Sequence, residues 1–196
     1  MTFTLPAFAK IAAIIPCYTA TGDNTVIYST DGSTTVLASR VRAVIGRLAK
    51  SRAVDLAALR TRTRSITERT NLEPLPLAPG LVLVPVKVRR PRVIGDPTTG
   101  YINLHTIAGI CKTTKKPYQT RITLSGKAEI SVLWTPSTVN RQLVLARMAA
   151  TTAPTTQRLP TEVLKESFPG YATELLPLAV KLIDVFNEIV TIKQRL

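Results

Sequence analysis

The stretch LVLVPVKVRRPRVIGDPTTGYINL, residues 81–104, contains the transitions that decide the fold. Its first part, residues 81–88, mixes aliphatic and β-branched side chains at near-alternating spacing, which is typical of a strand. A cluster of cations around a proline follows, made of Arg89, Arg90 and Arg92. A Gly-Asp-Pro turn at 95–97 then leads into a second apolar run that starts at Tyr101. The stretch predicts two strands whose connection carries a cluster of guanidinium groups.

Segments of the same kind lie on both sides of this stretch. Residues 10–19 and 24–30 predict two short strands, because polar turn residues separate and follow them. Residues 102–111 are strand-like as well. Residues 120–134 alternate on both sides of Ser125-Gly126, which predicts a β-hairpin.

Two helices are expected between the second strand and residue 70. The first is expected to start at Thr34 or Thr35 and to reach about Lys50, because its apolar residues recur on one face at helical spacing. Its other side carries small residues beside cations, which would allow a phosphate backbone to approach. The second helix is expected to start at Asp55. Since threonine forms helices weakly, we expect the alternating arginines of RTRTRS to continue it as an extended arm.

The remaining segments complete an α+β fold class, an antiparallel β-sheet with flanking helices and an appended C-terminal amphipathic helix. Residues 70–80 carry three prolines and a glycine and are expected to be a connector. Residues 135–150 predict a helix with a proline near its start. Residues 172–196 hold a heptad seam, which fits either an oligomer interface or packing on the chain's own domain. The expected organisation is a basic nucleic-acid-binding domain at 1–152, a linker at 153–160 and a C-terminal helical segment at 161–196.

The charge of the chain is strongly positive and unevenly distributed. The formal net charge is +14, yet residues 34–160 alone hold 21 basic and five acidic side chains. Such a surface attracts polyanions, namely DNA, RNA or an anionic membrane. The longest apolar segment, 175–192, is interrupted by three charged residues, which argues against a membrane span. Two cysteines without a disulfide or metal spacing fit a reduced, cytoplasmic chain. If its polyanion is DNA, the expected location is the nucleoid.

No catalytic constellation is apparent, so we expect no enzyme activity, no metal and no cofactor. The single histidine, His105, lies in a strand-like run, and the 12 carboxylates are scattered. Asp96, Lys127 and Glu129 resemble a restriction-type nuclease core, but the lysine and glutamate stand in the reverse order. A DNA- or RNA-processing nuclease using Asp96 and Glu129 is therefore one alternative function. An RNA-binding structural protein is another, weakened by the scarcity of aromatic residues.

Residues 90–106 and 121–148 together resemble the ComK family, the competence transcription factors of Firmicutes. The matching features are Arg90-Pro91, the aliphatic pair before Asp96-Pro97, the strand from Tyr101 to Thr106, and the Leu124-Ser125-Gly126-Lys127 hairpin followed by a helix. Leu104-His105-Thr106 departs from that family's Phe-Pro-Thr, and residues 53–80 form an insertion. The resemblance implies sequence-specific binding of DNA as an oligomer, largely through an A·T-rich minor groove, and control of DNA-uptake genes.

The favoured interpretation is a DNA-binding transcriptional regulator that acts as a homo-oligomer on double-stranded DNA. Four groups of cations are its candidate DNA-binding residues. They are Arg40, Arg42, Arg47, Lys50 and Arg52 on the first helix; Arg60, Arg62 and Arg64 on the arm; Arg89, Arg90 and Arg92 at the strand junction; and Lys112, Lys115 and Lys116 in a loop.

Overall fold

Two antiparallel sheets and three α-helices make up the part of the chain that the computed structural model describes, residues 6–151. These residues belong to the first of two compact units, residues 1–153. The predicted α+β class is therefore confirmed. The expected linker at 153–160 and helix at 172–196 lie outside the described residues. Within 6–151, no helix is both long enough and apolar enough to cross a membrane.

The larger sheet has six strands in the order β3-β2-β1-β6-β5-β4, every neighbouring pair antiparallel. Its strands are β1 (Ile11–Thr19), β2 (Gly22–Ser29), β3 (Thr34–Leu37), β4 (Leu75–Ala78), β5 (Leu81–Lys87) and β6 (Thr99–Asn103), and a short 3₁₀ helix, η1 (Phe8–Lys10), precedes them. The smaller sheet has the order β7-β8-β9, with β7 (Ile107–Lys112), β8 (Thr120–Leu124) and β9 (Glu129–Val132). A second 3₁₀ helix, η2 (Leu104–Thr106), connects the two sheets.

Strand β5 is apolar almost throughout because both of its faces are buried. Leu81 and Leu83 belong to one buried cluster, which includes the apolar face of helix α1 (Val41–Lys50). Val82 and Val84 point to the other face, where Leu143 of helix α3 (Pro136–Thr151) packs on them. Since successive side chains of a strand alternate between faces, a strand covered on both sides reads as continuously hydrophobic.

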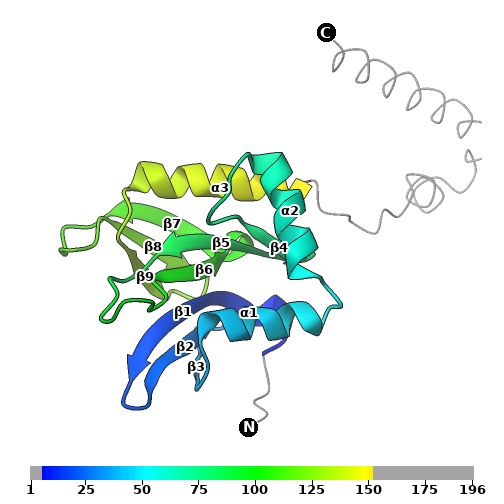
Figure 1. The fold of residues 1–196 in the computed structure, drawn as a ribbon. Coiled ribbons are helices and arrows are strands. Elements are labelled where there is room, and N and C mark those ends of the chain that lie inside the picture. The colour runs from blue at the N-terminus through cyan, green and yellow to red at the C-terminus, as the bar shows by residue number, and fades with distance from the viewer. Residues whose placement is uncertain (1–5, 152–196) are drawn as a thin grey trace, which may run out of the picture. The chain divides into compact units, whose positions relative to one another are not determined.

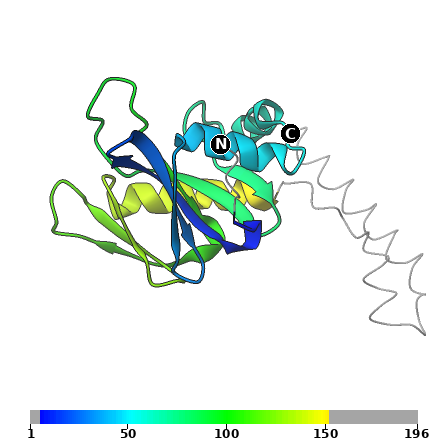
Figure 2. The same cartoon turned by 90° about the horizontal axis from the view of Figure 1, so that it is seen from below.

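The helices therefore lie on different sides of the larger sheet (Figures 1 and 2). Helix α1 contacts β1 and β2, whereas α3 contacts β5 and β7. Helix α2 (Leu56–Thr67) packs against α3 and β4, at the top of Figure 1. The smaller sheet shares a second core with β1, β5 and β6, in which Ile122 and Ile102 are fully buried.

The strands predicted at 10–19, 24–30 and 81–88 are confirmed, as are the hairpin within 120–134 and the helix from 136. The predicted start of the first helix is wrong. Residues 34–37 form strand β3, in which Thr35 pairs with Ile27 of β2, and the helix begins only at Val41. β-Branched threonine and valine suit an edge strand better than a helix, so the local preference agrees with the pairing.

Two further expectations are corrected. The expected connector at 70–80 contains strand β4, which pairs with β5 despite Pro76 because β4 is the edge of its sheet. The expected strand at 102–111 is divided into β6, η2 and β7. At the break, the Asn103 side chain accepts a hydrogen bond from the amide of His105 at 3.3 Å and donates to the carbonyl of Ile11 at 3.1 Å. This buried amide turns the chain from one sheet into the other.

Candidate nucleic-acid interface

Helix α1 presents a basic surface to solvent. Its buried side is made of Val41, Val44, Ile45, Leu48 and Ala49, and the exposed residues include Arg40, Arg42, Arg47 and Lys50. Arg40 occupies the N-cap position, and no side chain caps this end of the helix. Arg52 follows the helix, and its guanidinium lies 4.3 Å from the centre of the Phe8 ring.

The predicted extended arm is wrong, because residues 56–67 form one continuous helix. Asp55 caps α2 by accepting a hydrogen bond from the amide of Ala57 at 2.7 Å. Thr63 and Thr67 are buried, and the Thr67 hydroxyl donates to the carbonyl of Thr63 at 2.7 Å. Tertiary packing of the threonine face and the cap together outweigh the weak helix preference of threonine.

The helix separates the three arginines that an extended arm would have aligned. Successive helical residues are rotated by about 100°, so Arg62 faces away from Arg60 and Arg64. Arg64 pairs with the buried Glu73, its Nε 2.5 Å from Oε1. Arg60 and Arg62 are half-buried. The arm residues therefore do not form one projecting contact.

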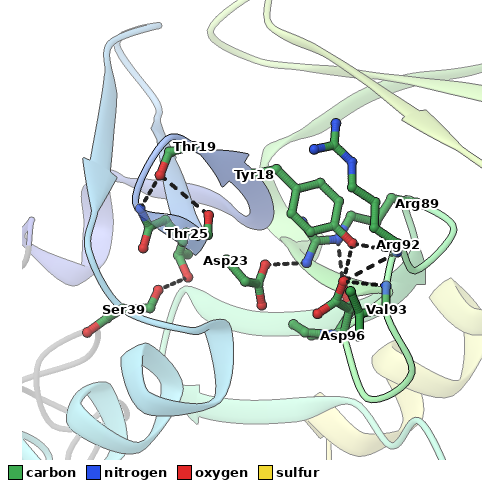
Figure 3. A network of polar contacts seen from close by, with 12 residues as sticks. Tyr18, Thr19, Asp23, Thr25, Ser39, Arg89, Arg92, Val93 and Asp96 are labelled. Carbon is green, nitrogen blue, oxygen red and sulfur yellow. Dashed lines mark hydrogen bonds and ion pairs between the residues drawn. The ribbon is translucent and has the colours of Figure 1, made fainter.

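The arginine-rich junction after β5 is held by a polar network shown in Figure 3. The Arg89 guanidinium forms an ion pair with Asp23, and its Nε donates to the carbonyl of Pro97 at 2.9 Å. The same guanidinium lies 3.8 Å from the centre of the Tyr18 ring, and that of Arg92 lies at 4.2 Å. The side chains of Arg89 and Asp23 are only 11% and 7% exposed. Arg89 thus fixes the loop, and it is not available at the surface.

Asp96 closes the same loop. Its Oδ2 accepts the Tyr18 hydroxyl at 2.6 Å and the backbone amide of Val93 at 3.1 Å. The hydrogen bond from Tyr18, followed by that from Val93, lowers the pKa of Asp96 below its ordinary value. The carboxylate form is the one that holds the loop together.

The tip of this loop projects from the network. Arg90 and Arg92 are exposed, and Val93 and Ile94 are 68% and 102% exposed. Neither arginine forms a salt bridge with a carboxylate in the described part of the chain. Of the junction cations predicted from the sequence, the loop presents these two to solvent and withdraws Arg89.

A separate basic loop connects β7 and β8. Lys112, Lys115 and Lys116 are exposed there, on the smaller sheet (left in Figure 1). They form no salt bridge within residues 6–151. The structure therefore presents exposed predicted cations in two regions, one around α1 and the junction loop and one on the β7–β8 loop, whereas Arg64 and Arg89 are held in ion pairs.

A pocket of about 350 Å³ lies where α1, α2 and the end of the junction loop meet. Its lining residues are Val41, Arg42, Ile45, Arg60, Pro97, Thr98, Thr99 and Tyr101. Sequence reasoning named Arg42 and Arg60 but not that they share one site, nor that the threonines belong to it. The only available signal was the Thr98-Thr99 pair after the predicted turn, which by itself is an ordinary turn sequence.

The residues of the alternative nuclease site are engaged elsewhere. Asp96 holds the junction loop, and Glu129 pairs with Arg121 at 3.4 Å on β8. Within residues 6–151, no three histidine, cysteine or acidic side chains gather in a way that could hold a metal ion. His105 is exposed in η2.

In comparisons with known proteins, no family model, no curated protein and no solved structure matches this chain.

Proposed function

We propose that this chain is a sequence-specific DNA-binding regulator of transcription. The observation that supports it best is the surplus of cations on the described domain. Residues 6–151 contain 21 lysines and arginines against seven carboxylates, and only three salt bridges join them. Neutralising phosphates with such cations releases counterions, which supplies most of the affinity of a protein for duplex DNA.

The aromatic residues favour a duplex over a single strand. Proteins that hold single-stranded nucleic acid stack its bases on accessible aromatic rings. All six aromatic residues of the described part are at least partly buried, and Arg89 and Arg92 lie over the ring of Tyr18. A surface rich in cations and poor in open aromatic faces suits phosphate contact with a double helix.

Within the region around α1 and the junction loop, the helix and the loop have different roles in this proposal. The cations of α1 contact phosphates and orient the protein on the duplex. Arg90 and Arg92, on a loop anchored by Asp96, reach into the minor groove, and the guanidinium of Arg92 leaves the ring of Tyr18 to do so. A·T-rich tracts narrow that groove and strengthen its negative potential, so these arginines give a preference for A·T-rich sites. Arg89 supports the loop and does not touch DNA.

The control of DNA-uptake genes is a narrower proposal that rests on the resemblance to the ComK family. Assembly through the C-terminal segment is a second narrower proposal, which rests on the heptad seam of the sequence and concerns residues outside the described part. Replacing Leu182 or Ile189 of its heptad seam with glutamate would dissociate the oligomer, whereas Lys181→Glu, off the seam, would not. Light scattering of the full chain measures the difference. An unchanged mass in the seam variants would place the interface elsewhere.

A binding selection from random duplexes tests the proposed function. We expect recovery of an A·T-rich motif, and loss of that motif in the Arg90→Gln/Arg92→Gln variant while weaker binding persists. Recovery of random sequence would contradict sequence-specific regulation. Incubation of a labelled duplex with magnesium separates the alternatives, because cleavage indicates a nuclease and a stable complex indicates a regulator. Stronger binding to folded RNA than to duplex DNA would favour the RNA-binding alternative.

A further inference from the structure

The pocket between α1, α2 and the junction loop carries positive charge without compensation from its own walls. Arg42 enters it from α1 and Arg60 from α2, and none of its eight lining residues is acidic. Neither arginine forms a salt bridge within residues 6–151. Glu73, a carboxylate whose charge acts on Tyr101, is already paired with Arg64 at 2.5 Å.

The remaining lining groups suit an oxyanion. The hydroxyls of Thr98 and Thr99 are hydrogen-bond donors, and the guanidinium groups are planar forks that match phosphate geometry. Burial raises the pKa of Tyr101, so its phenol stays protonated as a further donor, and Arg60 acts electrostatically on that hydroxyl. The walls thus provide charge and donors from three separate segments, α1, α2 and residues 97–101.

The start of α1 adds to the positive potential of the pocket. Val41 and Arg42 are the first two residues of the helix and both line the pocket. The amides of Ala43 and Val44 already donate to the carbonyl of Arg40, at 2.9 and 3.2 Å, so those of Val41 and Arg42 are the first-turn donors that remain for a ligand, and the helix dipole is positive at this end. No side chain caps this end, and a helix N-terminus of this kind favours an anion.

The buried network behind the loop keeps the opposite wall in place. Arg89 donates to the carbonyl of Pro97 at 2.9 Å, and the amide of Val88 donates to the carbonyl of Thr98 at the same distance. The wall is therefore fixed to β5. A pocket of about 350 Å³ is at the small end of ligand pockets, which span roughly 300–1,000 Å³.

We propose that this pocket is a binding site for one phosphate group, held by Arg42, Arg60 and the first turn of α1. The phosphate is either part of a nucleic-acid backbone or belongs to a small phosphorylated molecule. The site does not require the proposed function, since a free phosphate compound would occupy it in the same way.

Titration of the full chain with inorganic phosphate, against sodium chloride at equal ionic strength, tests the site. Amide shifts in ¹H–¹⁵N spectra report where phosphate binds. We expect saturable shifts at Val41, Arg42, Thr98 and Thr99 that chloride does not produce. If chloride produced the same saturable shifts, or if phosphate shifted only amides in other regions, the proposal would be overturned.

Two matched pairs of variants sharpen the test. Arg60→Gln should weaken phosphate binding at least about tenfold, whereas Arg62→Gln, on the same helix and also half-buried, should leave it unchanged. Arg42→Gln and Arg141→Gln, the latter an exposed arginine of α3 that does not line the pocket, form the second pair. Each variant removes one charge, so equal losses within both pairs would mean that general attraction, and no pocket, holds the ion.

Adding a short duplex to the phosphate-saturated protein identifies the source of the phosphate. Competition between duplex and phosphate means that the pocket holds a backbone phosphate, and simultaneous binding means that it holds a small phosphorylated ligand. Both results uphold the site. If phosphate binds as expected and the duplex does not bind at all, the proposed function fails and the pocket stands.

Discussion

Arg89, just after β5, forms an ion pair with Asp23 of β2, 66 positions away in the sequence. The pair joins the arginine-rich junction to the β1–β2 hairpin and is almost completely shielded from solvent. Asp23 Oδ2 and Arg89 Nη1 are buried without a hydrogen-bond partner within residues 6–151. A cation that composition alone assigns to a binding surface is instead a structural support of that surface.

Replacing Asp23 with asparagine should lower the free energy of unfolding by roughly 3 kcal/mol, because the guanidinium of Arg89 would stay buried without its counter-charge. Urea denaturation measures the loss. The exposed Asp31→Asn variant is the control and should cost less, because an asparagine oxygen can still accept the hydrogen bond from the Ser33 amide. Since two atoms of the pair are unsatisfied, the Asp23→Leu/Arg89→Met double variant should be more stable than Asp23→Asn. A single variant as stable as wild type would show that the pair contributes nothing.

Replacing Tyr18 with phenylalanine should raise the pKa of Asp96 toward its ordinary value, because the hydrogen bond from Tyr18 is the largest cause of its depression. The carboxyl ¹³C shift of Asp96, followed against pH, measures the change. The pKa of Asp31, lowered by Ser33, serves as an internal control and should not move.

The same contact should make the junction loop sensitive to acid. A depressed pKa stabilises the folded state above the unfolded pKa of about 4, and this contribution is lost as the pH falls through the lower folded value. Amide exchange of Arg92 and Val93 should therefore accelerate below about pH 4 in wild type. In Tyr18→Phe the acceleration should begin at higher pH; the same profile in both proteins would contradict the assignment.

Gly126→Ala should be destabilising by roughly 1–3 kcal/mol, the usual cost of overpacking. A Cβ there would lie 2.8 Å from the amide nitrogen of Gly32 and 2.9 Å from the carbonyl of Thr30, so the β8–β9 turn and the β2–β3 turn would have to separate. Gly109→Ala on β7 is the matched control, because its Cβ would meet nothing within 4 Å. Thermal denaturation measures the unfolding midpoint of both variants. Equal midpoints would contradict the close approach of the two turns.

The strands were predictable from sequence because their alternation reflects burial, as in β5, where even and odd positions enter different clusters. The helical course of RTRTRS was not, since the buried contacts of Thr63 and Thr67 that favour it come from distant segments. Strand β4 was missed because the three prolines of residues 70–80 indicate a connector, and only the edge position of β4 makes Pro76 within it acceptable.

The candidate site was likewise predictable from the sequence only in part. The exposed cations of α1 follow from the helical period of their apolar neighbours, which the sequence displays. The withdrawal of Arg89 depends on Asp23, and the union of Arg42 with Arg60 depends on how α1 and α2 meet at β6. Neither relationship leaves a local pattern, because each joins residues far apart in the chain.

The salt dependence of duplex binding tests the proposed function most directly. Arg40 and Arg47 lie seven residues apart on one side of α1, so both can face the same duplex. With about six phosphate contacts, log K should fall against log salt with a slope of about −5 in wild type, and Arg40→Ala/Arg47→Ala should flatten it by one to two units. Arg141→Ala/Arg147→Ala on α3, which removes two exposed cations from the other side of the sheet, should leave the slope unchanged. An equal slope in wild type and the α1 variant, or no salt-dependent binding at all, would contradict the account.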